Sequence, residues 1–401
     1  MRPIRIYLDS SDFSFLSDPK RTTREGESTL KKLRLFISSG EVICCFSGIH
    51  LSEMAPVDAK FTDAAERRAL LLEDLCGKNA VISQDRLFAA ELRYAHKMSS
   101  EMIDVHSISG DWFPDGIAEI SPIGAHAFEE SINTVIAELG LSRRNRRLAE
   151  RWAMKRGNPR SHIRAATVQR ARLGNLDDVL DKYPMRPQDA RVLMRYFAGD
   201  ASKTDGENAF LNSLRDPRWM MSWFRQHHER MIPFIEWTRS PAAPIISSLE
   251  TMTTLAEGLR KKDASLGTSL FKELFSSKQW ADWQADLLSR AANRASDSLI
   301  STGLPRLSAN TIDRMCPGIS AGIRSLHNAW RTATTATPRR PKLSDFPDAL
   351  HAIYSPYVDV FRADSFMAPY VQAQVERFGT IVVQRLSGLV PAIETCLSRK
   401  Q

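Results

Sequence analysis

The two ends of this 401-residue chain share one pattern, in which short apolar strands alternate with helical segments. Residues 4–9 (IRIYLD) predict a strand that stops on Asp9, and residues 348–364 predict a helix entered on Asp348, then a strand that leads to Asp364. Strands alternating with helices are typical of βαβ units and a parallel sheet. Because the strand ends of such a sheet share one edge, where open α/β folds bind ligands, we expect acids from both ends of the chain to meet there.

The expected elements at the two ends are short and regularly spaced. The run Val42–Phe46 is continuously apolar, as a parallel strand covered on both faces requires. Apolar runs predict strands at 4–8, 42–46, 80–82, 358–361 and 380–383. Helical spacing predicts helices at 27–37, 52–55, 63–75, 85–97 and 367–378, and a closing helix that ends near residue 397. The ends together predict one α/β domain with a central parallel sheet flanked by helices.

The middle of the chain lacks this alternation. Segments such as 208–215, 245–262 and 268–299 have apolar residues at i, i+3 and i+4, which predicts helices. We therefore expect residues 1–98 and 343–401 to form the two parts of the α/β domain, and residues 99–342 to form a large all-α insertion.

Four acids lie in sequence contexts that resemble those of the PIN-like nuclease family, a group of metal-dependent ribonucleases. Its members open with a strand ending in Asp-(Ser/Thr)-(Asn/Ser), matched by Asp9-Ser10-Ser11, and a second strand leads to a helix bearing Glu, matched by VICCFSGIHLSEMA with Glu53. A late helix begins with Asp in a D-A-L-x-A pattern, matched by Asp348–Ala352, and the next strand ends in a turn carrying Asp, matched by VDVFRADSF with Asp364. The long middle departs from the compact domain of the family.

The resemblance implies a metal site. Clustered carboxylates repel one another, and hard oxygen ligands suit Mg²⁺ or Mn²⁺. One or two such ions would activate a water that hydrolyses a phosphodiester bond. The implied ligands and catalytic residues are Asp9, Glu53, Asp348 and Asp364. The alternative is that these acids cap helices or face solvent, as Asp348 would at the start of its helix.

Two further residues are candidates for supporting this site. Ser11 matches the small polar family position beside Asp9 and would orient that carboxylate or a metal-bound water; alternatively it caps the following helix. His351 follows Asp348 by three residues, hence on the same helix face. It would contact substrate phosphate, or else be a buried, hydrogen-bonded histidine.

Positive charge is concentrated in one segment of the chain. The net charge is +8, and residues 143–172 hold ten arginines and one lysine against the single acid Glu150. Such a patch is typical of phosphate recognition, although it could also be a solvated helix or a dock for an acidic partner. The candidate nucleic-acid ligands are Arg143, Arg144, Arg146 and Arg147, with Arg339 and Arg340 just before the late helix.

Composition excludes several classes of protein. No run of 18 apolar residues is present, so no membrane span is expected, and the first residues do not predict a signal peptide. The five cysteines form no C-x-x-C pair, so we expect reduced thiols and a cytoplasmic location. The chain has no P-loop, GxGxxG or GxSxG motif, which argues against nucleotide hydrolases, dinucleotide enzymes and serine hydrolases.

The sequence therefore predicts a metal-dependent endoribonuclease with a nucleic-acid partner. RNA is the commoner substrate of the family, and DNA stays open. Two alternatives remain at this stage: a catalytically silent PIN-like scaffold that binds RNA or protein, and a toxin or defence effector controlled by an inhibitory or regulatory partner. The oligomeric state is not predicted.

Overall fold

The computed structural model describes residues 2–56, 59–101, 104–115, 142–155, 158–159, 176, 180, 183–197, 200–227, 242–274, 276–335 and 345–400. The chain divides into two compact units. The first unit comprises Met1–Trp112 and Phe224–Gln401, and the second comprises Phe113–Trp223. Within the described residues, no helix has both the length and the apolar character needed to cross a membrane.

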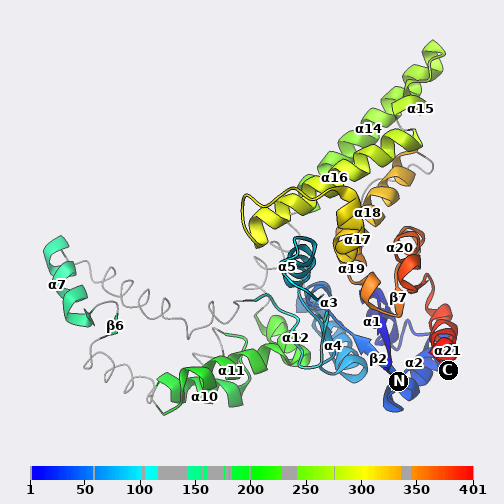
Figure 1. Ribbon diagram of the computed structural model, residues 1–401. Coiled ribbons are helices and arrows are strands. Elements are labelled where there is room, and N and C mark those ends of the chain that lie inside the picture. Colours follow the sequence, from blue (N-terminus) through cyan, green and yellow to red (C-terminus); the bar gives the residue numbers. More distant parts are fainter. Residues whose placement is uncertain are drawn as a thin grey trace. The chain divides into compact units, whose positions relative to one another are not determined.

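A wholly parallel, four-stranded sheet lies at the centre of the first unit (Figure 1). Its order is β2 (Val42–Cys45), β1 (Ile4–Tyr7), β7 (Val360–Arg362) and β8 (Ile381–Val383). The first and last segments of the first unit thus pair directly, β1 with β7. This arrangement confirms the expected α/β class with a central parallel sheet.

A third N-terminal strand extends this order. An isolated parallel bridge joins Phe46, just after β2, to Ala80 in β3 (Ala80–Val81). The strand β3 also pairs antiparallel with β4 (His106–Ser107). The resulting order, β3-β2-β1-β7-β8, reverses direction between β1 and β7, as in doubly wound folds.

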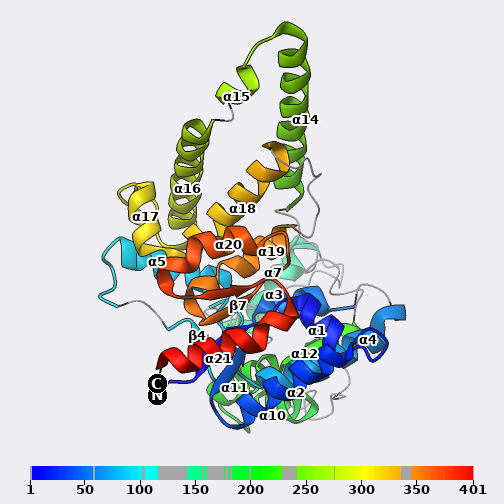
Figure 2. The same ribbon diagram turned by 90° about the vertical axis from the view of Figure 1, so that its right-hand side faces the viewer.

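Helices cover the sheet and join its strands (Figure 2). Before the second unit they are α1 (Ser10–Leu16), α2 (Arg24–Ser38), α3 (Gly48–Met54), the 3₁₀ turn Ala59–Phe61, α4 (Thr62–Cys76) and α5 (Gln84–Ala95). After it they are α14 (Ala242–Leu266), α15 (Leu270–Leu274), α16 (Ser277–Leu299), α17 (Ala309–Met315), α18 (Pro317–Thr335), α19 (Asp345–Ala352), α20 (Ala368–Val375) and α21 (Leu389–Lys400), with 3₁₀ turns at Ser355–Tyr357, Glu376–Phe378 and Leu386–Gly388.

The core explains why the short strands are so apolar. Ile4, Ile6 and Tyr7 of β1 are completely buried, as a strand covered on both faces requires. Tyr7 and Phe361 belong to a cluster completed by side chains of α18, α19 and α20. The ring of Tyr7 stacks on that of Phe361, with centroids 5.4 Å apart. Burial of such aromatic side chains is the main stabilising contribution here.

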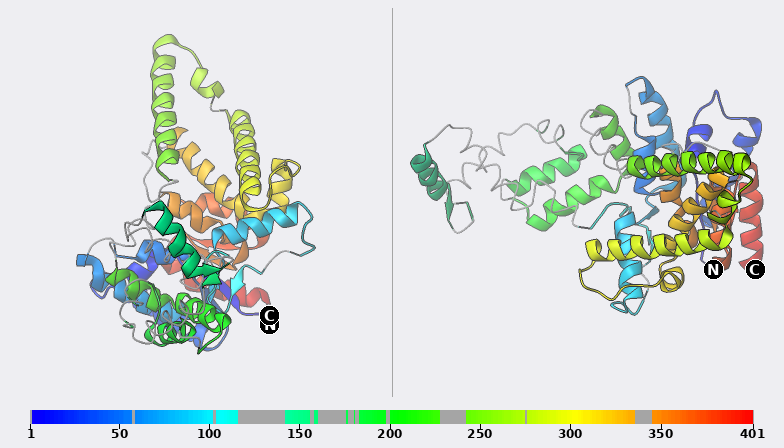
Figure 3. Two further views of the ribbon diagram at one scale, coloured as in Figure 1. Left: turned by 90° about the vertical axis from the view of Figure 1, so that its left-hand side faces the viewer. Right: turned by 90° about the horizontal axis from the view of Figure 1, so that it is seen from above.

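The two ends of the chain are also tied by polar contacts through Asp359. Its carboxylate accepts a hydrogen bond from the backbone N–H of Arg5 (2.8 Å) and pairs with the Arg2 guanidinium (2.9 Å). The Lys400 ammonium lies 3.8 Å from the same carboxylate. The N- and C-terminal ends accordingly lie side by side in every view (Figures 1, 2 and 3).

Two glycines of α18 lie close to Ile353, the residue that follows α19. A Cβ added to Gly322 would lie 2.7 Å from the Ile353 side chain, and one added to Gly318 would lie 2.8 Å from the Ile353 carbonyl oxygen. The buried carboxylate of Glu91 accepts hydrogen bonds from the first N–H groups of α18 and from the Tyr357 hydroxyl. These contacts fix the position of α19, which carries His351.

The described part of residues 99–342 is mostly helical, and it is divided between the two units. The helices α14 to α18 belong to the first unit; α14 and α16 form two long arms joined through α15 (Figure 3). The second unit contains α7 (Arg143–Ala153), the strand pair β5 (Met154–Lys155) and β6 (Asn158–Pro159), α10 (Pro187–Phe197), α11 (Lys203–Leu214) and most of α12 (Pro217–Gln226). The compact second unit is thus smaller than the expected insertion.

Candidate functional site

The candidate site lies at the carboxyl ends of β1 and β7. The register pairs Ile6 with Val360 and Tyr7 with Phe361; Asp9 follows the last residue of β1 by two positions, and Asp364 follows the last residue of β7 by two. Adjacent strands are about 4.8 Å apart, which brings these two acids from opposite ends of the chain to one edge of the sheet. This edge is also where the strand order reverses, the position at which open α/β sheets bind ligands.

Asp9 is the N-cap of α1. Its Oδ1 accepts a hydrogen bond from the backbone N–H of Ser11 (2.7 Å), while its own N–H donates to Asp12 Oδ2 (3.2 Å). This reciprocal capping fixes the chain where the strand turns into the helix. Across the described residues, no hydrogen bond or ion pair reaches Asp9 Oδ2, so that oxygen is available to a ligand.

Asp12 is neutralised inside the protein. It is buried, and its Oδ1 lies 3.2 Å from the guanidinium of Arg362 at the end of β7. Burial raises the pKa of Asp12 to about 7, with the Arg362 charge acting in the opposite direction. Removing Arg362 would leave the charged Asp12 carboxylate buried without a partner, which would cost much free energy of folding. Asp12 therefore supports the joint between β1 and β7 rather than serving as a ligand.

Asp364 holds the turn that follows β7. Its Oδ1 accepts a hydrogen bond from the backbone N–H of Met367 (2.6 Å), just before α20. The side chain is partly buried. Like Asp9, this acid sits where a strand gives way to a helix, so the local backbone fixes its position.

Glu53 on α3 is held by two donors on one oxygen. Its Oε2 accepts hydrogen bonds from Ser10 Oγ (2.6 Å) and His351 Nε2 (2.8 Å). Burial acts to raise the pKa of Glu53, but the hydrogen bonds from His351 and Ser10 outweigh it and hold the pKa below its ordinary value. Glu53 is therefore ionised near neutral pH. We call Asp9, Glu53 and Asp364, with Ser10 and His351, the carboxylate site.

A chain of buried hydrogen bonds lies beneath Glu53. His351 Nδ1 is 2.6 Å from the Tyr7 hydroxyl, which is 2.7 Å from Ser47 Oγ. Ser47 in turn donates its backbone N–H to His50 Nδ1 (3.0 Å), and His50 Nε2 donates to the carbonyl of Leu8 (2.9 Å). Because a carbonyl only accepts, His50 carries its proton on Nε2. Burial, together with the nearby His351, lowers the pKa of His50 to about 3, so its ring is neutral.

Asp348, the fourth expected ligand, lies on α19 one turn before His351. This helix begins at Asp345, one turn earlier than expected, so Asp348 is not its first residue. The expectation that Asp348 opens the helix is therefore wrong, because the helical turn starts at the preceding Asp345-Phe-Pro. Asp348 is partly buried.

The described residues contain no group of three or more His, Cys, Asp or Glu side chains arranged to hold a metal ion. The acids contact the protein's own groups: Glu53 Oε2 accepts from two donors, Asp12 pairs with Arg362, and one oxygen each of Asp9 and Asp364 accepts from a backbone N–H.

The expected arginine patch is described only in part. Arg143, Arg144, Arg146 and Arg147 lie on α7 of the second unit, where all four are exposed. Within the described part of the chain, their guanidinium groups form no ion pair or hydrogen bond. Arg339 and Arg340, like the rest of the patch beyond residue 159, lie outside the described residues.

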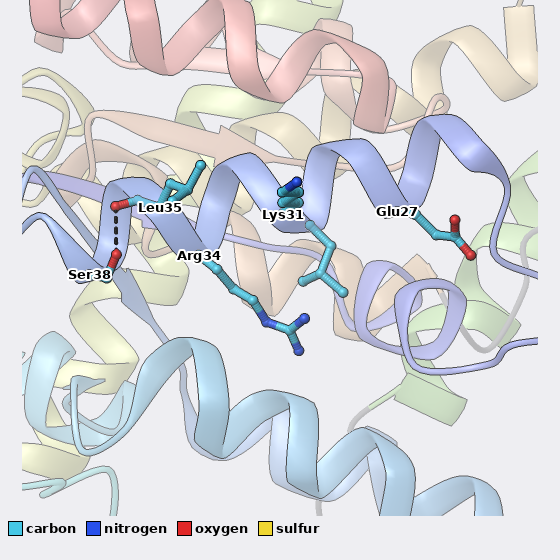
Figure 4. A pocket seen from close by; sticks show the side chains of 6 residues that line it. Glu27, Lys31, Arg34, Leu35 and Ser38 are labelled. Atoms are coloured by element: carbon cyan, nitrogen blue, oxygen red, sulfur yellow. Dashed lines mark hydrogen bonds between the residues drawn. The ribbon is translucent and has the colours of Figure 1, made fainter.

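A shallow hollow of about 390 Å³ follows one face of α2 (Figure 4). It is lined by Glu27, Leu30, Lys31, Arg34, Leu35 and Ser38. The Arg34 guanidinium already pairs with Asp74 at 2.7 Å. None of the four expected acids lines this hollow, so it is not the candidate site.

Sequence reasoning missed most of the supporting contacts. It expected Ser11 to orient Asp9 or to cap the following helix, and Ser11 contacts Asp9 through its backbone N–H; the contact of Ser10 with Glu53 was not expected. It left His351 open, and the structure places this residue in the core as the donor to Glu53. The role of Tyr7 had no signal in the sequence, because a tyrosine in a buried strand is ordinary.

Comparison with other proteins adds no family assignment. Searches of protein-family models, of curated proteins and of solved structures gave no significant match to this chain.

Proposed function

We propose that this protein is a metal-dependent, PIN-like endoribonuclease that hydrolyses phosphodiester bonds at the carboxylate site. The observation that supports it is the pairing of β1 with β7, which brings Asp9 and Asp364 to one edge of a parallel sheet where the strand order reverses. Acids separated by 355 positions reach that edge in the order and contexts that the family resemblance implies.

The donor set suits Mg²⁺ or Mn²⁺ as the proposed cofactor. Mg²⁺ is commonly held by one or two carboxylates, with water and substrate phosphate completing its shell, so a larger protein cluster is not required. Asp9 and Asp364 would hold it, with Glu53 alongside and Asp348 on the neighbouring helix. When bound, such an ion lowers the pKa of a water and stabilises charge on the attacked phosphate.

The chain's own residues would keep this site ready for a substrate. Ser10 and His351 keep Glu53 ionised, and the α1 and α20 backbones hold Asp9 and Asp364 in place. The exposed arginines of α7 would bind nucleic-acid phosphates by charge, without selecting a sequence. RNA is the proposed substrate because the family acts mostly on RNA.

A second candidate function is a catalytically silent scaffold that binds RNA or a protein partner. It is favoured by one observation: in the described residues every acid of the carboxylate site already has a protein partner, and no metal-binding group of three is formed. A nuclease controlled by an inhibitory partner, as in toxin or defence systems, is a variant of the first candidate.

One experiment separates the two candidates. Purified full-length protein is incubated with labelled single-stranded RNA and DNA in Mn²⁺, Mg²⁺ or EDTA. The nuclease proposal expects RNA fragments with either metal and none with EDTA. Retention of intact RNA in a binding assay, without cleavage in any metal, would instead support the scaffold.

A further inference from the structure

We infer that His351 is a positioning residue for Glu53, held in place by Tyr7, and that Glu53 presents its second oxygen, Oε1, to the reaction. The claim that Glu53 serves a reaction rests on the proposed function. The claim that Tyr7 and His351 fix Glu53 concerns only contacts within the first unit.

The proton on His351 Nε2 follows from the chemistry of its partner. Glu53 Oε2 lies 2.6 Å from Ser10 Oγ as well as 2.8 Å from His351 Nε2, and a carboxylate oxygen with two such neighbours accepts from both. The 2.8 Å contact between His351 Nε2 and Glu53 Oε2 therefore requires a proton on Nε2, whatever the charge of the ring. A charge-assisted contact of this length is among the stronger hydrogen bonds in proteins.

Tyr7 accommodates His351 in either charge state. With a neutral ring, the Tyr7 hydroxyl donates to Nδ1 over 2.6 Å and accepts from Ser47 Oγ. With a protonated ring, Nδ1 donates to the Tyr7 oxygen, and the hydroxyl of Tyr7 turns to donate to Ser47. No hydrogen bond is lost in either arrangement, so the ring keeps one orientation and Nε2 stays on Glu53.

Burial makes this arrangement rigid. Tyr7 and Ser47 are completely buried and His351 nearly so, whereas Glu53 keeps 24% of its side chain exposed. In the described residues no hydrogen bond or ion pair reaches Glu53 Oε1. One oxygen is thus fixed from below by Ser10 and His351, and the other is left for a metal, a water or the substrate.

The first test measures the contact itself in the full-length protein. Nitrogen-15 NMR of labelled histidine is expected to show the Nε2–H form of His351 throughout pH 6–8. A neutral Nδ1–H form would overturn the inference. Carboxyl carbon-13 titration then follows Glu53 in variants at His351; the other titratable groups that act on or respond to Glu53 are His50 and Tyr7.

The variants compare loss of the donor with its replacement. In His351→Leu the pKa of Glu53 should rise by about one unit, because the donor is gone, whereas His351→Gln, whose amide can donate, should retain a low pKa. Cleavage should fall about 10–100-fold in kcat for His351→Leu, at nearly constant KM, and much less for His351→Gln. An unchanged pKa of Glu53 in His351→Leu would overturn the inference.

Two controls separate the role of His351 from general effects of mutation on the fold. His96→Gln alters a histidine that contacts Ser296 away from the site, and it should leave both the pKa of Glu53 and cleavage unchanged. If His351→Leu does not fold, Tyr7→Phe tests the same support: it removes the partner of His351 Nδ1 and should lower kcat at nearly constant KM, while Nε2 keeps its proton on Glu53. If wild-type protein cleaves nothing, the proposed function fails, while the NMR results still decide the role of His351.

Discussion

The carboxylate site of the first unit and the helix α7 of the second carry opposite charges, and they differ in whether those charges have partners within the protein. In the carboxylate site each acid has a built partner: Ser10 and His351 for Glu53, and backbone N–H groups for Asp9 and Asp364. On α7, four arginines are exposed, and their side chains form no ion pair with the described residues. The first arrangement suits a reaction that needs fixed geometry, and the second suits a ligand that brings its own negative charge.

This difference also separates what each region contributes to folding. Asp9 caps α1 just after β1, and Asp364 accepts a backbone hydrogen bond in the turn between β7 and α20, so these two contacts stabilise the ends of both strands. The four exposed arginines of α7 repel one another, and their side chains form no stabilising ion pair with the described residues. Exposed positions of that kind can be replaced at little cost, which makes the two regions separable by mutation.

The largest expected effect is on catalysis by Asp9→Asn. Asparagine keeps the size of the side chain and is an equally good N-cap for α1, so folding should be preserved. It removes a charged oxygen ligand, and we expect cleavage to fall at least about 100-fold. The measurement is single-turnover cleavage of RNA with Mn²⁺, together with the melting temperature.

The matched control for Asp9→Asn is Asp18→Asn. Asp18 also accepts a hydrogen bond from a backbone N–H, that of Lys20 (3.0 Å), but it lies in the turn after α1. This variant should cleave like the wild type. Near-normal turnover by Asp9→Asn would show that the carboxylate site does not take part in the reaction. The comparison of this site with the exposed arginines of α7 would then have no functional meaning.

The α/β class and the positions of two acids, Asp9 and Asp364, were predictable for a local reason. Buried parallel strands are short apolar runs, and the runs at 4–8, 42–46, 358–361 and 380–383 coincide with β1, β2, β7 and β8. Asp9 and Asp364 follow two of these strands directly, so their meeting at one edge follows from a parallel sheet. Their hydrogen bonds with backbone N–H groups two and three residues ahead require no knowledge of distant residues.

The support beneath the site was not predictable, because its contacts are distant in sequence. Tyr7 meets Ser47 at a separation of 40 residues and His351 at 344. Ser10 meets Glu53 at a separation of 43 residues. The close packing of Gly318 and Gly322 against Ile353 is a further contact that leaves no local pattern in the sequence.

The second prediction sharpens the role assigned to α7. Replacing Arg143, Arg144, Arg146 and Arg147 by glutamine should flatten the dependence of RNA affinity on salt by up to about four units, because each lost phosphate contact contributes roughly one. The loss should be similar for many sequences. Filter-binding or fluorescence titrations between 50 and 300 mM salt would measure it.

The contrast between the units sets the control for this variant. Because the carboxylate site lies in another unit, kcat at saturating RNA should change little, and the melting temperature should stay within about 2 °C. An unchanged salt slope would remove α7 from the path of the nucleic acid. It would then favour a solvated surface or a dock for an acidic protein.

The smallest expected effect concerns the stability of the buried chain beneath Glu53. The pKa of His50 is about 3 in the folded protein because burial, and secondarily His351, disfavours its charged form. In the unfolded chain it is about 6.5, so the unfolded state binds more protons between these values. The contribution of His50 is therefore complete above pH 6.5 and is lost as the pH falls towards 3. His50→Gln should destabilise the protein most near pH 7 and progressively less towards pH 4, which urea unfolding at several pH values would measure. A constant difference in the free energy of unfolding between wild type and variant over that range would show that a neutral, buried His50 does not support the site.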